Sequence, residues 1–252
     1  MTSSNEYKLK TNQKVYRFIK AVVDFIIALI AIIILSPLFL VVAVAIKVDS
    51  PGPVFFFQKR IGKNGKIFNW MKFRSMSIDA RHDIAGYEYE NVQSCVTKTG
   101  AFIRRFSIDE LPQLFNILTF KMSLIGFRPS QEKETELNNA RENYNMYQVR
   151  PGISGWAQIN GRDILAANPK LKAEYDAYYL KHFSLWLDIK IFFVTIIKIL
   201  KSDDVVEGVI DAQQSSIDEK IDIVDEESNA ADHVTKNEFN NPEEDIKQKE
   251  IV

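Results

Sequence analysis

The sequence predicts an α+β fold that is mostly helical and that carries one membrane-length segment near its N-terminus. Three observations support this prediction. Residues 21–46 are almost entirely apolar, Asn64-Gly65 lies between two apolar runs, and residues 108–200 carry several helical patterns. About 20 apolar residues are enough to cross the hydrocarbon core of a bilayer, and an Asn-Gly pair between apolar runs is a strong signal for a β-hairpin.

Charge is unevenly distributed along the chain. Residues 201–252 contain 16 acidic and 5 basic residues, a net charge of −11, whereas the whole 252-residue chain has a net charge of −1. Residues 1–200 therefore carry +10, which indicates anionic partners such as nucleotides, phosphates, lipid headgroups or nucleic acid. The acidic tail has few aromatic residues and is predicted to be disordered, either as a solvated tail without chemistry or as a segment that recruits partners.

Several common kinds of site are excluded by the residues present. The single cysteine, Cys95, allows no disulfide within one chain and no CxxC zinc site. The three histidines, His82, His182 and His233, are far apart and do not form an HExxH pattern. The chain has neither the GxxxxGK pattern of a P-loop nor the GxGxxG pattern of a dinucleotide-binding fold.

The apolar segment, residues 21–46, allows three interpretations. A cleaved signal peptide would explain the basic start and the small residues Ala43-Val44-Ala45, but the apolar core of a signal is only ~7–15 residues long. A transmembrane helix fits the length, and membrane helices tolerate a proline such as Pro37. Residues 21–36 would form a helix about 24 Å long, which is too short to cross a hydrocarbon core of ~30 Å. This length fits a re-entrant helix, which enters and leaves the membrane on one face.

Basic residues flank this segment on both sides. Arg17 and Lys20 precede it, and Lys47, Lys59 and Arg60 follow it. Cytoplasmic flanks of membrane helices carry the excess of Lys and Arg, so both ends are expected on the cytoplasmic side. A bent helix satisfies this expectation and a single span does not. From the residues alone, the spanning and the re-entrant interpretations both remain open.

The region after the membrane segment begins with the predicted hairpin. Residues 54–57 are an apolar run that is expected to be a strand or a membrane-interface anchor, and residues 59–76 contain six basic residues and no acidic one. This basic stretch is interleaved with aromatic residues. It is therefore either a solvated hairpin or a cradle for a polyanion.

The remaining elements are predicted to be helices. Residues 108–121 form an amphipathic pattern that begins near Ser107, a residue type able to cap a helix. Residues 131–148 and 168–183 are polar helical stretches. Residues 184–200 are apolar with charged residues interspersed, which suits a core helix or a helix lying in the headgroup plane.

Two adjacent acidic residues, Asp109 and Glu110, are the strongest candidates for chemistry. Arg104 and Arg105 precede them and Arg128 follows them. Adjacent carboxylates on a helix do not face each other, so they cannot flank a glycosidic bond, but they can approach one metal ion or phosphate. Mg²⁺ binds one or two carboxylates together with phosphate oxygens, and a carboxylate can also attack phosphorus to form an acyl phosphate. The structural alternative is that both acids only stabilise a helix N-terminus.

A series of motifs in fixed order resembles the bacterial sugar transferase family, the monotopic phosphoglycosyl transferases. The resemblance covers roughly residues 15–200 and excludes the acidic tail. The residues that carry it are Ser36-Pro37, Lys59-Arg60-Ile61-Gly62, Lys72-Phe73-Arg74-Ser75-Met76, Asp109-Glu110-Leu111-Pro112-Gln113, Arg128-Pro129, and Arg150-Pro151-Gly152 through Gly161-Arg162. One departure is Phe127, which stands where the family would place a proline before Arg128-Pro129.

The resemblance implies a reaction and a set of residue roles. Such enzymes transfer a phospho-sugar from a UDP-sugar to undecaprenyl phosphate and release UMP, with Mg²⁺ and a covalent intermediate on aspartate. Carried over, Asp109 is the nucleophile, and Asp109 and Glu110 together hold the metal. Arg128 is expected to bind phosphate. The remaining expected substrate-binding residues are Lys59, Arg60, Lys72, Arg74, Arg105 and Arg162. Asp176 is a weaker match to an acidic residue of the family.

The resemblance also implies the organisation of the chain. It divides into an N-terminal segment (1–17), a re-entrant helix-break-helix in the membrane (18–48), a catalytic domain at the interface (49–200) and the acidic tail (201–252). Amphipathic interfacial helices and the hairpin would surround an active site on the cytoplasmic face of the inner membrane. Because few residues precede the membrane segment, the chain is expected to be the minimal form of the family.

The partners implied by the resemblance are a UDP-sugar, undecaprenyl phosphate and the lipid bilayer, with downstream glycosyltransferases as further candidates and no nucleic acid. Nothing in the sequence predicts the oligomeric state or the sugar. An alternative function is a non-catalytic membrane-bound adaptor, whose basic body would bind anionic lipid while the acidic tail recruits partners.

Overall fold

The computed structural model describes residues 7–77, 95–161, 165 and 167–201. The predicted tail lies almost wholly outside these residues. In the described part the fold is mostly helical with a few short strands, as predicted. Its elements are α1 (Thr11–Asp49), β1 (Phe55–Ile61), a 3-10 turn (Lys63–Gly65), β2 (Ile67–Phe73), α2 (Lys98–Arg105), a 3-10 turn (Ile108–Glu110), α3 (Gln113–Leu118), β3 (Ser123–Ile125), α4 (Thr135–Asn143), a 3-10 turn (Met146–Gln148), β4 (Gly152–Ser154), α5 (Trp156–Ile159), α7 (Pro169–Lys181) and α8 (Leu185–Lys201).

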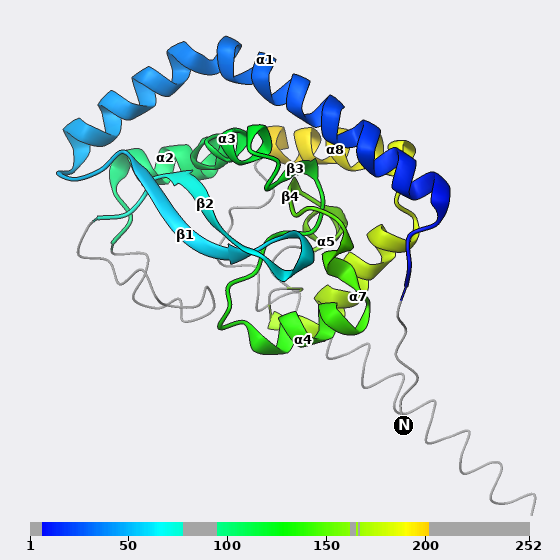
Figure 1. Ribbon diagram of the computed structural model, residues 1–252. Helices are drawn as coiled ribbons and strands as arrows, with labels where there is room; N and C mark the ends of the chain where they lie inside the picture. The colour runs from blue at the N-terminus through cyan, green and yellow to red at the C-terminus, as the bar shows by residue number, and fades with distance from the viewer. Residues whose placement is uncertain (1–6, 78–94, 162–164, 166, 202–252) are drawn as a thin grey trace, which may run out of the picture. The chain divides into compact units, whose positions relative to one another are not determined.

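The apolar segment forms one long helix, α1, with Pro37 inside it. Proline cannot donate the hydrogen bond that the carbonyl of Ile33 would otherwise accept. The hydroxyl of Ser36 donates to that carbonyl at 2.8 Å instead, so the Ser-Pro pair leaves the helix continuous. The predicted break is thus not an interruption of the helix. Figure 1 shows α1 as an arch whose two ends turn toward the rest of the described chain.

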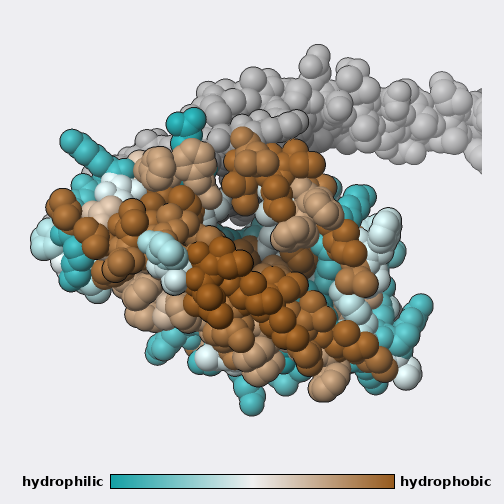
Figure 2. All heavy atoms as spheres, turned by 90° about the horizontal axis from the view of Figure 1, so that it is seen from above, coloured by the Kyte–Doolittle hydropathy of each residue, from teal (hydrophilic) through white to brown (hydrophobic). Residues whose placement is uncertain are grey.

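Much of the surface of α1 is apolar and exposed. Its most apolar 18-residue window is only 11% buried, and the helix is long enough to cross a membrane. Figure 2 looks onto α1 from above and shows hydrophobic side chains gathered on this face. The exposed apolar residues of α1 and α8 include Val22, Ile26, Ile30, Ile33, Ile34, Leu40, Val41, Val44, Trp186, Phe192, Phe193, Ile197 and Leu200. An exposed apolar surface of this extent indicates membrane association.

A buried polar cluster fastens the first half of α1 to the rest of the protein. The ammonium of Lys20 lies 2.9 Å from Asp188 of α8 and 3.3 Å from Asp24. Asp24 also accepts a hydrogen bond from Ser123 at 2.5 Å, and Asp188 accepts one from Tyr179 at 2.8 Å. The charges are therefore paired and hydrogen-bonded, as buried charges must be. Asp24 lies in this cluster rather than in hydrocarbon.

The predicted hairpin is confirmed. Strands β1 and β2 pair antiparallel from Phe55↔Phe73 to Ile61↔Ile67. Asn64 and Gly65 occupy the turn with φ of 59° and 70°, in the left-handed region that favours these two residue types. The apolar run at residues 54–57 is mainly strand, so of its two expected roles the structure shows the strand.

The predicted helix over residues 108–121 is wrong in its extent. The structure has a 3-10 turn at Ile108–Glu110, and the α-helix α3 begins only at Gln113. Ser107 does not cap a helix, because its backbone is left-handed with φ of 53° and its side chain makes no capping hydrogen bond. Pro112 lies at the N-cap of α3, where its missing N–H is no loss.

A short parallel pair, β3 with β4, was not predicted. Ser123 pairs with Gly152 and Ile125 pairs with Ser154. The two backbones meet so closely that a Cβ on Gly152 would lie 2.1 Å from the nitrogen of Gly126, and one on Gly155 would lie 2.0 Å from the carbonyl oxygen of Gly126. Gly152 and Gly155 are therefore required where the two backbones cross. Arg128 and Arg150 lie two residues from Gly126 and Gly152 in the sequence.

Candidate active site

The two adjacent carboxylates follow a residue with a strained backbone and are both buried. Asp109 is 6% exposed and Glu110 is 8% exposed. They form the 3-10 turn that follows the left-handed Ser107. A left-handed conformation is uncommon at residues other than glycine. The few residues that adopt it are concentrated at functional sites. This turn presents both carboxylates to the basic residues of the hairpin.

Two cations bracket the carboxylates. The ammonium of Lys72 on β2 lies 3.3 Å from Asp109 and 2.8 Å from Glu110. The guanidinium of Arg128 donates to both oxygens of Glu110, at 2.8 and 3.3 Å. This bidentate geometry fixes the orientation of the Glu110 carboxylate. Asp109 contacts Lys72 through Oδ2 and lies next to a cavity.

Trp70 supports the cationic side of the site. Three cations lie over its ring, with Lys72, Arg60 and Arg128 at 4.4, 4.7 and 5.2 Å from the ring centre. The pairing explains the first two, because Trp70 lies opposite Gln58 while Lys72 and Arg60 flank that pair on the same face. Cations are attracted to the face of an indole ring. Trp70 thus spaces three positive charges around one aromatic platform.

A cavity of about 180 Å³ opens at these residues. Its walls come from the hairpin, the residues after β2, α2 and the 3-10 turn at the acidic pair. The lining residues are Phe56, Trp70, Lys72, Phe73, Arg74, Ser75, Met76, Arg104 and Asp109. Pockets that enclose a whole drug-sized ligand have volumes of about 300–1,000 Å³, so this cavity is suited to the reacting part of a larger substrate.

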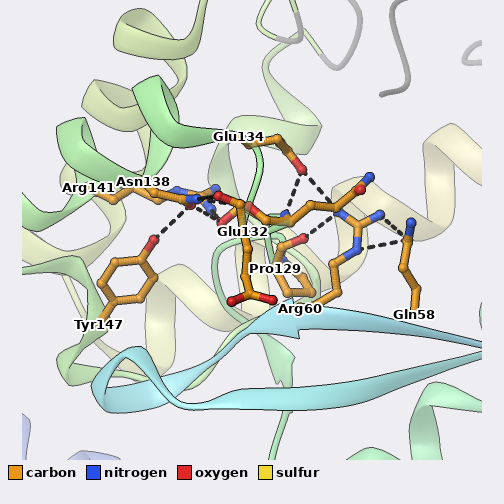
Figure 3. A network of polar contacts seen from close by, with 10 residues as sticks. Gln58, Arg60, Pro129, Glu132, Glu134, Asn138, Arg141 and Tyr147 are labelled. Carbon is orange, nitrogen blue, oxygen red and sulfur yellow. Dashed lines mark hydrogen bonds and ion pairs between the residues drawn. The ribbon is translucent and has the colours of Figure 1, made fainter. Parts of the chain in front are cut away.

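The loop that carries Arg128 is held from the hairpin side by Arg60. Its guanidinium donates to the carbonyl of Pro129 at 3.2 Å, forms an ion pair with Glu134 at 3.2 Å, and donates to Gln58 at 2.6 Å (Figure 3). Burial, reinforced by the positive charge of Arg128, lowers the pKa of Arg60 to about 10. Arg60 remains charged at neutral pH and is used to position the loop.

The same loop is held from the other side by Arg141. This side chain is fully buried and pairs with Asp176 at 2.6 Å. It also donates to the hydroxyl of Ser130 at 3.1 Å, and its guanidinium lies 4.9 Å from the centre of the Phe127 ring. Phe127, the departure from the family pattern, thus packs in the core against Arg141. Figure 3 shows Arg141 and Arg60 approaching the loop from different elements.

The charge balance of the site favours an anionic ligand. Burial disfavours the charged form of Arg128, but the charge and hydrogen bonds of Glu110 more than offset it, so the pKa of Arg128 is raised. Arg60, Lys72, Arg104 and Arg128 gather here against the two carboxylates of the acidic pair and Glu134. Such preorganised positive charge stabilises the negative charge that develops during phosphoryl transfer.

The other expected site residues are placed differently. Arg74 contributes to the cavity wall, but its guanidinium donates to the carbonyls of Pro51 and Ser50 at 2.6 and 2.7 Å and so fastens the end of α1. Lys59 is exposed on the opposite face of the hairpin from Arg60. Arg105 is exposed beside the ring of Phe106, at 5.7 Å. Its neighbour Arg104 lines the cavity instead, and Arg162 lies outside the described residues.

Within the part of the chain that the structure describes, the acidic pair is the candidate for a metal site. In the described residues no three His, Cys, Asp or Glu side chains are grouped to hold a metal ion. Mg²⁺ needs only one or two carboxylates when phosphate oxygens and water supply the remaining ligands. Asp109 and Glu110 fit that requirement.

Comparisons with known proteins identify the family of this chain. The profile of the family described as "Bacterial sugar transferase" matches residues 15–202. A UDP-N-acetylgalactosamine-undecaprenyl-phosphate N-acetylgalactosaminephosphotransferase of Aeromonas hydrophila is 47% identical over 189 residues, which are 74% of this chain and 44% of that protein. A UDP-glucose:undecaprenyl-phosphate glucose-1-phosphate transferase of Xanthomonas campestris pv. campestris is 41% identical over 188 residues, which are 72% of this chain and 38% of that protein.

A shorter relative is matched over more of its length. An uncharacterized sugar transferase of Bacillus subtilis is 41% identical over 168 residues, which are 67% of this chain and 79% of that protein. The chain thus spans less than half of the Aeromonas and Xanthomonas proteins. The residues that the family profile matches contain the acidic pair, the hairpin, Arg128, α8 and all but the first turn of α1. The chain belongs to the bacterial sugar transferase family.

Proposed function

We propose that this protein transfers a phospho-sugar from a UDP-sugar to undecaprenyl phosphate and releases UMP, as the first membrane step in the assembly of a glycan. One observation carries the proposal: Asp109 lines a cavity while Lys72 and Arg128 bracket the acidic pair. The names of the Aeromonas and Xanthomonas relatives, which act on UDP-sugars and undecaprenyl phosphate, support it.

The chemistry proceeds in two displacements at phosphorus. In the first, a carboxylate oxygen of Asp109 bonds to the phosphorus attached to the sugar, and the bond from that phosphorus to the bridging oxygen breaks. UMP leaves with the electron pair, and the phospho-sugar remains on Asp109. In the second, a phosphate oxygen of the lipid attacks the same phosphorus and the carboxylate leaves, which restores Asp109 and forms the lipid diphosphate sugar.

The neighbouring residues bind and orient charge during both displacements. Lys72 and Arg128 are placed to contact phosphate oxygens, and Arg104 adds positive charge at the cavity wall. Glu110 and Asp109 would hold a Mg²⁺ ion, which when bound neutralises part of the diphosphate charge. Arg60 keeps the Arg128 loop in position. A covalent intermediate predicts ping-pong kinetics.

The acceptor lipid requires the site to lie at a bilayer. The exposed apolar residues of α1 and α8 provide the membrane contact, and the basic residues at both ends of α1 favour the cytoplasmic side of the inner membrane. We propose that α1 is re-entrant, since its arch turns both ends toward the described body. The adaptor alternative requires neither a buried acidic pair nor a cavity beside it.

The test of the proposed function is UMP release. The purified protein is incubated with polyprenyl phosphate, Mg²⁺ and each member of a panel of UDP-sugars. We expect at least one donor to give UMP in proportion to lipid product, and chelation of Mg²⁺ to abolish the release because the diphosphate charge is then not neutralised. Turnover that is unaffected by chelation would contradict the assigned role of the acidic pair as metal ligands, and no turnover with any donor would favour the adaptor.

The membrane topology predicts a labelling pattern. Cysteines introduced at residue 5 and in the tail after residue 210 are expected to be shielded from an impermeant thiol reagent in intact spheroplasts and labelled after lysis. Replacement of Ser36 and Pro37 by leucine removes the proline that favours a bent helix and is expected to favour spanning, so that the residue 5 tag becomes accessible. In the unsubstituted protein, labelling of only one tag would show that α1 spans the membrane.

A further inference from the structure

A second group of basic side chains lies in a recess that the proposed reaction does not use. Arg17 and Lys20 of α1 line this recess, together with Arg150 from the Arg150-Pro151-Gly152 motif and with Asp24. The enclosed part is small, about 20 Å³, which is close to the volume that one water molecule needs. Any larger ligand must therefore remain mostly at the surface.

The charges in this recess are not all paired. Lys20 is neutralised by Asp24 and Asp188, at 3.3 and 2.9 Å. Arg17 donates to the uncharged carbonyl of Gln148 at 3.0 Å. Arg150 forms no ion pair with a residue that the structure describes, and the nearby Asp24 is already shared with Lys20. The guanidinium groups of Arg17 and Arg150 thus lie close together with little negative charge around them.

A third cation joins them from the hairpin. The turn Lys63–Gly65 packs against the turn Met146–Gln148, which ends two residues before Arg150. Burial, and then the positive charges of Arg17 and Arg150, lower the pKa of Lys63. Burial also lowers the pKa of Arg150, against the opposing effect of Asp24. The three cations are near enough to repel one another, which an anion bound among them would relieve.

The position of Arg150 indicates where such an anion lies. Its guanidinium is 5.2 Å from the centre of the Phe120 ring, and Phe120 stacks on Phe25 of α1 at 5.4 Å. Phe120 is 49% exposed, and the neighbouring Val22 and Ile26 of α1 are exposed as well. A basic side chain at the edge of an exposed apolar surface lies at the depth of lipid headgroups, where anionic lipids attract Lys and Arg.

We propose that Arg17, Lys63 and Arg150 bind the headgroup phosphate of an anionic phospholipid. The site is separate from the acidic pair, because six residues of strand at about 3.3 Å each, from Lys66 to Lys72, place the hairpin turn roughly 20 Å from the catalytic end. A phosphate held here cannot reach Asp109. The inference rests on the membrane association of α1 and does not depend on the chemistry at Asp109.

The test is lipid retention measured by native mass spectrometry. The detergent-purified protein is mixed with phosphatidylglycerol or with phosphatidylcholine of the same acyl chains. We expect preferential retention of phosphatidylglycerol, and a decrease of about fivefold in that retention for each of Arg150→Gln and Lys63→Gln. Lys170→Gln, which removes the same charge from an exposed position on α7, is expected to retain the lipid. Lys63 is on a surface turn, so its replacement leaves the fold intact.

Two outcomes would overturn the proposal. The first is retention of phosphatidylglycerol by Arg150→Gln and Lys63→Gln at the level of the unsubstituted protein. The second is found with polyprenyl phosphate as the probe: if both variants lose this lipid and keep phosphatidylglycerol, the site belongs to the acceptor. Asp109→Asn is expected to retain phosphatidylglycerol fully, so failure of the proposed reaction and failure of this site are distinguishable.

Discussion

Replacement of Asp109 by asparagine is expected to lower the rate of UMP release by at least about a thousandfold, because the amide cannot form the acyl phosphate on which both displacements depend. The fold should persist, since Lys72 keeps its 2.8 Å contact with Glu110. The rate is measured with the donor identified in the panel, and the melting temperature is measured in parallel.

The matched control for this substitution is Glu142→Gln. Glu142 is an exposed carboxylate on α4, so its replacement removes one negative charge away from the cavity and is expected to leave the rate unchanged. Turnover by Asp109→Asn at more than a tenth of the rate of the unsubstituted protein would remove Asp109 from the role of nucleophile.

Replacement of Arg141 by methionine is expected to cause the largest loss of stability. It leaves Asp176 buried without its partner, which typically costs about 3–5 kcal/mol. For a domain of this size, that loss corresponds to a decrease in melting temperature of about 10 °C. The loop that carries Arg128 would also lose its contact at Ser130. The rate of the variant is therefore expected to fall by more than the loss of folded protein explains.

Two further variants separate charge burial from a general packing defect. The double variant Arg141→Met with Asp176→Leu removes both charges and is expected to recover most of the lost stability. Lys170→Met breaks the exposed contact with Glu136, which is 3.8 Å long, and is expected to change the melting temperature by less than about 2 °C. A melting temperature of Arg141→Met within that same range would contradict the importance assigned to the pair with Asp176.

The sequence predicts an element well when neighbouring residues alone determine its conformation. Asn64-Gly65 dictates the hairpin turn, and Asn168 caps the N-terminus of α7 by accepting from the backbone of Leu171. The helix expected over residues 108–121 was wrong because the left-handed Ser107 and the 3-10 turn depend on tertiary contacts. The β3–β4 pair joins segments far apart in sequence through close contact at Gly126 and Gly152, and no local pattern predicts such a contact.

The site could be predicted only in part for the same reason. The motifs indicated Asp109, Glu110, Lys72 and Arg128, which the structure brings together at one cavity edge. Trp70 and Arg104 were not among the expected site residues, although the alternation of residues on β2 places Trp70 on the same face as Lys72. Counting basic residues cannot separate Arg104 from Arg105, since their difference arises from which side of α2 faces the cavity.

The supporting residues were harder to identify than those that line the cavity. Nothing local to Arg141 indicates that it is fully buried, and its role follows from contacts with Asp176 and Ser130 on other elements. Arg74 belonged to a recognised motif, yet its guanidinium binds backbone carbonyls at the end of α1. Motifs therefore mark residues that have a role without telling whether the role is chemical or structural.

If Asp109 is the nucleophile, it carries the phospho-sugar between the two displacements. The most direct measurement is the mass of the protein after incubation with the productive UDP-sugar and Mg²⁺ in the absence of lipid acceptor, followed by acid quench and peptide mapping. We expect a mass increase equal to one phospho-sugar on the peptide that contains Asp109, with an equal amount of UMP and no adduct in Asp109→Asn. UMP release upon addition of acceptor without any such adduct at Asp109 would contradict it.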